Sequence, residues 1–136
     1  MKIFDCFTYN NEDLILDLRL NYLNQYINKF IIVESKYTHQ GTVKTNFLNL
    51  NNFKKYQNKI EYHLIDEFPK NLSNWGRENF QRNFIMNLIN NLKDDDYIMI
   101  SDLDEIPNLN NLNNIEKYKF TAFKQLNFSY KINLQN

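Results

Sequence analysis

Residues 94–107, DDDYIMISDLDEIP, decide how the rest of the chain is interpreted. The run Tyr97–Ile100 is apolar, has the length of a strand and is rich in residues that suit a buried, pleated surface. In an extended chain, side chains two positions apart point the same way, so Asp102 and Asp104 would converge on one point while Leu103 faces the core. The stretch therefore predicts a short buried strand that ends in paired carboxylates.

Paired carboxylates such as Asp102 and Asp104 repel each other unless a cation lies between them or one takes up a proton. A hard divalent cation, Mn²⁺ or Mg²⁺, prefers oxygen ligands and can share its coordination with a substrate diphosphate. The alternative is an ordinary acidic turn on the surface, because short Asp-x-Asp patterns also arise by chance. The strand upstream favours a metal site, since ligands of open α/β sheets gather at the carboxyl ends of strands.

The composition indicates one globular domain, residues 1–136, and excludes several classes of protein. The chain has 136 residues, of which 43% are hydrophobic and 15% aromatic, enough for a packed core. Lys plus Arg equals Asp plus Glu at 16 each, which gives no support to a nucleic-acid partner. The single cysteine, Cys6, excludes a disulfide framework and a multi-cysteine zinc site.

The sequence also gives no sign of a membrane. No segment approaches the roughly 20 apolar residues that cross a bilayer. The N-terminal stretch 1–13 has only a very short apolar run and lacks the core of a signal peptide. The chain is therefore expected to have no membrane span and to be cytoplasmic.

Apolar patterns along the rest of the chain predict strands that alternate with helices. Strands are expected at 2–8, 30–33, 60–65, 97–100 and 118–132, and helices at 12–27, 48–56 and 77–92. Asn10 or Asn11 is expected to cap the first helix. This order predicts the α/β class: a Rossmann-like, mostly parallel sheet with flanking helices. There is no GxGxxG and no GxxxxGK[ST], so a bound phosphate would depend on a metal and on arginines.

Three further charged residues are candidates for such a site. Arg77 and Arg82 lie near the start of the 77–92 helix, where backbone N–H groups favour anions, and Arg suits bidentate phosphate contact. The alternative is that they pair with nearby carboxylates on a solvated face. Glu34 ends the second strand, and it is either beside the expected cleft or simply in water.

Four motifs together resemble one known family. The motifs are DLDEIP at 102–107, WGRENFQR at 75–82, KIFDCFTYNNEDLILDLRLNYL at 2–23, and FIIVES at 30–35 followed by THQG and Lys44. Their order and spacing resemble glycosyltransferase family 17. The resemblance implies a GT-A-like nucleotide-diphospho-sugar transferase fold. It also implies a UDP-sugar donor, with N-acetylglucosamine as the sugar, a glycan or glycoprotein acceptor, and Mn²⁺ or Mg²⁺ as the cofactor.

The resemblance also assigns roles to single residues. Asp104 would bind the metal directly, and Asp102 would bind it through water or hold the ribose. Glu105 would lie near the donor sugar. The nucleoside pocket would be lined by Phe7, Thr8, Tyr9 and Glu34. Arg77 and Arg82 would contact the diphosphate or the donor sugar. No residue is assigned as the general base.

One departure from the family concerns the C-terminal part. The chain ends about thirty residues after Pro107, where family members continue into an acceptor region, and it lacks the membrane anchor of the Golgi members. The expected function is therefore a metal-dependent glycosyltransferase, or its donor-binding half with the acceptor half missing. The alternative is an inactive fragment that binds a nucleotide sugar and needs a further segment or partner for turnover. A phosphohydrolase with an aspartate nucleophile is disfavoured, because Ile106 stands where that chemistry uses Thr or Val.

Overall fold

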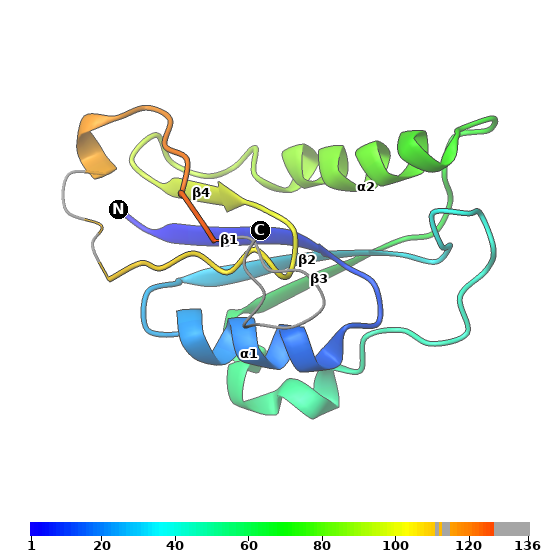
Figure 1. The fold of residues 1–136 in the computed structure, drawn as a ribbon, viewed down its shortest axis with the longest axis horizontal. Helices are drawn as coiled ribbons and strands as arrows, with labels where there is room; N and C mark the ends of the chain where they lie inside the picture. Colours follow the sequence, from blue (N-terminus) through cyan, green and yellow to red (C-terminus); the bar gives the residue numbers. More distant parts are fainter. Residues whose placement is uncertain (111, 113–114, 127–136) are drawn as a thin grey trace. The chain divides into compact units, whose positions relative to one another are not determined.

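Four parallel strands form the sheet that positions every candidate residue of the first unit (Figure 1). They are β1 (Ile3–Tyr9), β2 (Lys29–Ser35), β3 (Ile60–Ile65) and β4 (Tyr97–Ile100), in the spatial order β3-β2-β1-β4. The prediction of an α/β fold with a parallel sheet is confirmed. Two of the four strands, β3 and β4, have the bounds that the sequence predicts. The burial expected for β4 is wrong, because it is paired on one side only, with β1, among the described residues, and Ile98 and Ile100 are exposed.

A computed structural model describes residues 1–110, 112 and 115–126. The chain divides into two compact units, Met1–Asp104 and Glu105–Asn136. The sheet and its helices belong to the first unit. No helix in the described part of the chain has the length and apolar character needed to cross a bilayer.

Helices cover both faces of the sheet. In Figure 1, α2 (Asn74–Leu88) lies on one face, and α1 (Asp13–Leu23) lies on the other together with the 3₁₀ helix η1 (Leu50–Lys59). On the α2 face, Ile85 joins a buried cluster formed by Phe4, Cys6, Ile31, Val33 and Ile65. On the α1 face, Leu16, Leu20 and Leu23 of α1 are buried. The sheet is therefore the middle of three layers.

The strand order places a topological switch point between β1 and β4. From β1 the chain moves outward through β2 to β3, and α2 then carries it back to the other side of β1. Cys6 pairs with Ile100 at the last step of the β1–β4 ladder, where β4 ends, and β1 continues three residues further to Tyr9. Open α/β sheets bind ligands outside the carboxyl ends of strands at such a point.

Several predicted helix ends are wrong. The helix predicted over 12–27 ends at Leu23. The helix predicted over 77–92 begins earlier, at Asn74, because Ser73 caps it by accepting a hydrogen bond from the Gly76 amide. Neither Asn10 nor Asn11 caps α1. Its N-cap is Glu12, without a side-chain cap bond, because Asn11 adopts a left-handed backbone (φ 61°) that turns the chain into the helix.

The strand predicted over 118–132 is also wrong in its described part. Residues 118–126 form no strand, and the 3₁₀ turn η2 (Ile115–Lys117) precedes them. Phe120 is 85% exposed. Alternating apolar residues form a strand only where a neighbouring strand supplies the hydrogen bonds, and residues 118–126 have no such partner in the part of the chain described. Residues 127–132 lie outside the described residues.

Candidate functional site

The acidic turn, Asp102–Asp104, follows β4 directly after Ser101. Leu103 is buried at 3% exposure, whereas both aspartates are exposed. The prediction that Leu103 faces the core is confirmed. The extended geometry expected there is wrong, because Leu103 and Asp104 lie in a turn. The buried leucine fixes the turn against the core and leaves the two carboxylates outside.

A buried arginine–aspartate pair lies beneath the acidic turn. Arg19 of α1 and Asp5 of β1 are both fully buried. The guanidinium donates from Nε to Asp5 Oδ2 at 2.9 Å and from Nη2 to Asp5 Oδ1 at 2.7 Å. This is the bidentate geometry that arginine forms with a carboxylate, and it joins the helix to the sheet in the interior.

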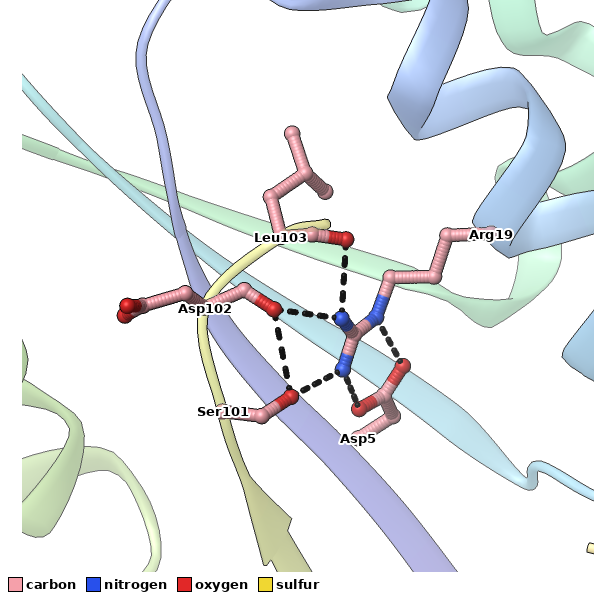
Figure 2. Close-up of polar contacts among 5 residues, drawn as sticks. All are labelled: Asp5, Arg19, Ser101, Asp102 and Leu103. Atoms are coloured by element: carbon pink, nitrogen blue, oxygen red, sulfur yellow. Dashed lines mark hydrogen bonds and ion pairs between the residues drawn. The ribbon is translucent and has the colours of Figure 1, made fainter. Parts of the chain in front are cut away.

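The same guanidinium also binds the acidic turn (Figure 2). Arg19 Nη1 donates to the backbone oxygens of Asp102 at 2.7 Å and Leu103 at 3.0 Å, and Nη2 donates to Ser101 Oγ at 2.7 Å. The Asp102 carboxylate points away from this contact in Figure 2. Arg19 therefore binds the backbone of the turn, and the Asp102 carboxylate lies on the outer side.

On that outer side, a second arginine approaches from α2. Arg82 Nη2 donates to Asp102 Oδ1 at 2.8 Å, and it also lies 3.4 Å from Glu78 Oε1. The Arg82 and Asp102 side chains are 39% and 52% exposed. The structure thus brings together two of the residues predicted for the site, in a pair that solvent can reach.

Glu12 adds a third carboxylate to the electrostatic environment of the turn. The pKa of its carboxyl is raised, first by partial burial and then by the charge of Asp104, with a smaller contribution from Asp102. A like charge raises the pKa of a carboxyl only when it lies nearby. The end of β1 therefore contributes negative charge to the same place as the end of β4.

Glu34 lies inside the protein instead of beside a cleft. Its carboxylate is fully buried and accepts hydrogen bonds from Lys44 Nζ, from the Leu48 amide at 2.9 Å and from the Tyr62 hydroxyl at 2.8 Å. Burial and the bond to Glu34 raise the pKa of the Tyr62 hydroxyl. Glu34 and Lys44 thus form a second buried ion pair, at the end of β2.

Arg77 binds the loop that follows β2. Its guanidinium donates to the backbone oxygens of His39 at 2.7 Å and Leu72 at 2.6 Å, and to Asn74 Oδ1 at 2.8 Å. A Cβ at Gly41, whose φ is +89°, would lie 3.3 Å from Arg77 Cζ. These contacts hold the 36–44 loop against the start of α2, and the structure does not bring Arg77 to the acidic turn.

The remaining predicted residues occupy different environments. Phe7 is fully buried, with its ring centroid 4.6 Å from Arg19 Cζ. Tyr9 is also buried, and its hydroxyl donates to Asp13. Thr8 is partly exposed. Glu105 is exposed and begins the second unit.

The donor set of the acidic turn fits a hard cation, although it is incomplete alone. Among the described residues, no group of three or more His, Cys, Asp or Glu side chains is placed to hold a metal ion. Asp102 and Asp104 nonetheless offer exposed carboxylate oxygens, the ligands that Mn²⁺ and Mg²⁺ prefer. Burial is the main cause of the raised pKa of Glu12, and the charges of Asp104 and Asp102 add to it.

Sequence reasoning missed Asp5, Arg19 and Glu12 as parts of this site. For Arg19 a signal exists: it lies between Leu16 and Leu20 on the stripe that α1 buries. Asp5 likewise interrupts an apolar strand. A charged residue on each of two apolar surfaces that face one another indicates a buried ion pair, because a lone buried charge is too costly.

An all-parallel α/β sheet with charged side chains at its switch point is the architecture of nucleotide-binding α/β proteins. The sequence model of glycosyltransferase family 17 matches residues 1–129, and the chain belongs to that family. The resemblance predicted from the motifs is confirmed.

Curated relatives show how much of the family protein this chain covers. The human and rat β-1,4-mannosyl-glycoprotein 4-β-N-acetylglucosaminyltransferases are each 27% identical to it over 116 residues, which are 78% of this chain and 22% of the relative. The mouse enzyme is 26% identical over the same length. The chain therefore spans about a fifth of the length of these relatives. No solved structure was found to match it.

Proposed function

We propose that this chain is the donor-binding part of a metal-dependent glycosyltransferase. The substrates would be a UDP-sugar, with N-acetylglucosamine as the sugar, and a glycan or glycoprotein acceptor. Family membership and the names of the relatives support this assignment. The single observation that carries it is the position of the acidic turn at the switch point between β1 and β4, with Arg82 at 2.8 Å from Asp102.

In this proposal the acidic turn holds the cation. Asp104 would bind it directly, and Asp102 would bind it through water or hold the ribose. A bound Mn²⁺ or Mg²⁺ would supply charge stabilisation for the departing diphosphate. The negative charge sensed by Glu12 supports cation binding at this place.

Arg82 would contact the diphosphate. Its bond to Asp102 is exposed, so exchanging that carboxylate for a phosphate has little desolvation cost. The acceptor hydroxyl oxygen would form the new bond to the anomeric carbon while the bond from that carbon to the phosphate oxygen breaks. The bonding electrons leave with UDP, and the hydroxyl proton passes to a base that we assign to none of the described residues.

The other predicted residues would support the donor, some from the surface and some from the interior. Thr8, partly exposed near the end of β1, would border the nucleoside, and the buried Tyr9 beside it would support the pocket from inside. Phe7 and Glu34 are buried, so we propose that they shape the pocket from inside, Glu34 through its bonds to Lys44 and Tyr62. Arg77 would hold the 36–44 loop, and Glu105 would lie near the donor sugar.

Calorimetry of UDP binding with and without Mn²⁺ tests the proposal. We expect Mn²⁺ to raise the UDP affinity at least about tenfold, and Asp104→Ala to abolish that increase, because a metal-bridged diphosphate gains charge-assisted contacts. Asp95→Ala is the matched control, since it removes an exposed aspartate at the other end of β4 and should leave the increase intact. Equal UDP affinity with and without Mn²⁺ would overturn the proposal.

A second candidate is binding of a nucleotide sugar without transfer. It is favoured by the placement of the candidate residues of the first unit, whose proposed roles all concern the donor. Release of UDP from UDP-N-acetylglucosamine, lost in Asp104→Ala, would exclude this candidate. Donor binding without any UDP release would favour it.

A further inference from the structure

We propose that Arg19 is a positioning residue that sets the place of the acidic turn, an inference that rests on the proposed function. Its guanidinium gives each of its five N–H bonds an acceptor among the described residues, two on Asp5 and three on residues 101–103. A single buried group thereby joins β1, α1 and the segment that follows β4.

Arg19 contacts the acidic turn through backbone oxygens, which are not the carboxylate oxygens proposed to bind the cation. Arg19 binds the backbone oxygens of Asp102 and Leu103, and not the carboxylate of Asp102. Neutralising that carboxylate would weaken a cation site, whereas binding the backbone fixes its position and keeps its charge. The arrangement suits a residue that positions a ligand without competing for it.

Asp5 keeps the guanidinium in its orientation. The bidentate pair fixes the plane of the fork, so that Nη1 is directed at the two backbone oxygens. Burial in the interior prevents water from replacing these bonds, since both side chains of the pair are fully buried. The Phe7 ring, 4.6 Å from Arg19 Cζ, covers the guanidinium on one side.

A purely structural role for Arg19 predicts something different from a positioning role. A structural residue affects stability alone, so a folded variant binds UDP normally with and without metal. A positioning residue affects the metal-dependent part of UDP affinity and leaves the metal-independent part unchanged. The ratio of the two UDP affinities, with and without Mn²⁺, therefore separates the two roles.

The test compares Arg19→Lys with Ile85→Ala, at a temperature where circular dichroism shows both variants folded. Lysine keeps the positive charge but lacks the fork that reaches Asp5 and both backbone oxygens. Ile85 is fully buried on the α2 face and provides a loss of core stability away from the turn. We expect Arg19→Lys to reduce the Mn²⁺-dependent increase in UDP affinity about tenfold, and Ile85→Ala to leave it unchanged.

Ser101→Ala provides a milder variant in case Arg19→Lys does not fold. It removes one of the three acceptors in the 101–103 segment, and we expect a roughly threefold smaller Mn²⁺-dependent increase. An unchanged increase in the folded variants, or an equal loss in Ile85→Ala, would overturn the inference.

Failure of the proposed function would be recognised separately. If the unmodified chain shows no Mn²⁺-dependent UDP binding, the cation role is wrong, and ¹⁵N relaxation of residues 102–104 decides whether Arg19 positions the turn. Lower order parameters there in the folded variants Arg19→Lys or Ser101→Ala, with β1 unchanged, would support positioning. Unchanged order parameters in both would overturn it.

Discussion

Two acidic clusters flank β4, and their environments differ. Before the strand lies the leading cluster, Asp94–Asp96, and after it lies the acidic turn. In the leading cluster, Asp95 accepts from the Met1 ammonium at 3.1 Å, and Asp96 accepts from the Lys2 amide at 3.0 Å and the Lys93 amide at 3.2 Å.

In the acidic turn, Asp102 accepts from Arg82 at 2.8 Å, and the Glu12 carboxyl adds like charge nearby. The Met1 ammonium, through its hydrogen bond and its charge, lowers the pKa of Asp95, whereas Asp104 and Asp102 contribute to raising the pKa of Glu12. The comparison teaches that two clusters of similar acidic sequence can differ in what surrounds them. Position at the carboxyl end of a parallel strand, beside a switch point, is what separates the two clusters.

The largest expected effect concerns what lies beneath the acidic turn. Arg19→Met should lower the free energy of unfolding by about 3–5 kcal/mol, because it leaves the Asp5 carboxylate buried without its partner. Urea denaturation followed by circular dichroism measures this loss. The double variant Asp5→Leu/Arg19→Met should recover most of the stability. A single variant within about 1 kcal/mol of the unmodified chain would contradict the importance of this pair.

The outer arginine should behave in the opposite way. Arg82→Met should change the free energy of unfolding by no more than about 1 kcal/mol, since its pair with Asp102 is exposed. The same variant should lower UDP affinity in the presence of Mn²⁺ about tenfold, the loss expected for one hydrogen bond to a charged group. Calorimetry and thermal unfolding give the two values. Unchanged UDP affinity would remove Arg82 from the proposed site.

Glu12→Gln sharpens the electrostatic side of the comparison. Because its pKa is raised in the folded protein, ionisation of Glu12 opposes folding, and this cost is absent below the ordinary glutamate pKa and complete above the raised one. At neutral pH the variant should therefore unfold about 1 °C higher and bind Mn²⁺ roughly threefold more weakly. Thermal unfolding at neutral and acidic pH, with Mn²⁺ titration, measures both. A lower unfolding temperature at neutral pH would contradict the assignment.

The smallest effect belongs to the leading cluster. N-terminal acetylation removes the ammonium that donates to Asp95, so the pKa of that carboxyl should rise towards its ordinary value. The lowered pKa contributes stability that is present above the ordinary aspartate pKa and lost as the pH falls through the lowered one. A ¹³C titration of the Asp95 carboxyl follows the change. Metal-dependent UDP binding should not respond, and a response would mean that the two clusters are coupled.

The sequence predicts the framework of this fold well, because the framework depends on local patterns. Apolar runs predict the strands, and apolar residues at three- and four-residue steps predict α1 (Leu16, Leu20, Leu23) and α2 (Phe80, Phe84, Leu88). The strand expected over 118–132 fails in its described part for a different reason. Its alternation of Phe120, Ala122 and Leu126 says nothing about whether a neighbouring strand exists.

The candidate site is predicted only in part, because charged residues take their roles from distant neighbours. The sequence indicates that Asp102 and Arg82 belong to one place, and their 2.8 Å contact shows them together. It does not reveal that Glu34 is buried under Lys44, or that Arg77 binds a loop backbone. No local pattern specifies those contacts, since Glu34 also binds Tyr62, 28 positions away, and Arg77 binds His39, 38 positions away.

Paramagnetic broadening by Mn²⁺ tests the central claim most directly, because it compares the two acidic clusters in one spectrum. Substoichiometric Mn²⁺ should broaden the backbone amide signals of Asp102–Asp104 and Glu12 first, and added UDP should deepen that loss. The signals of Asp94–Asp96 should keep their intensity. Equal broadening of both clusters, or none at the acidic turn, would contradict the assignment of the turn as a cation holder for a diphosphate.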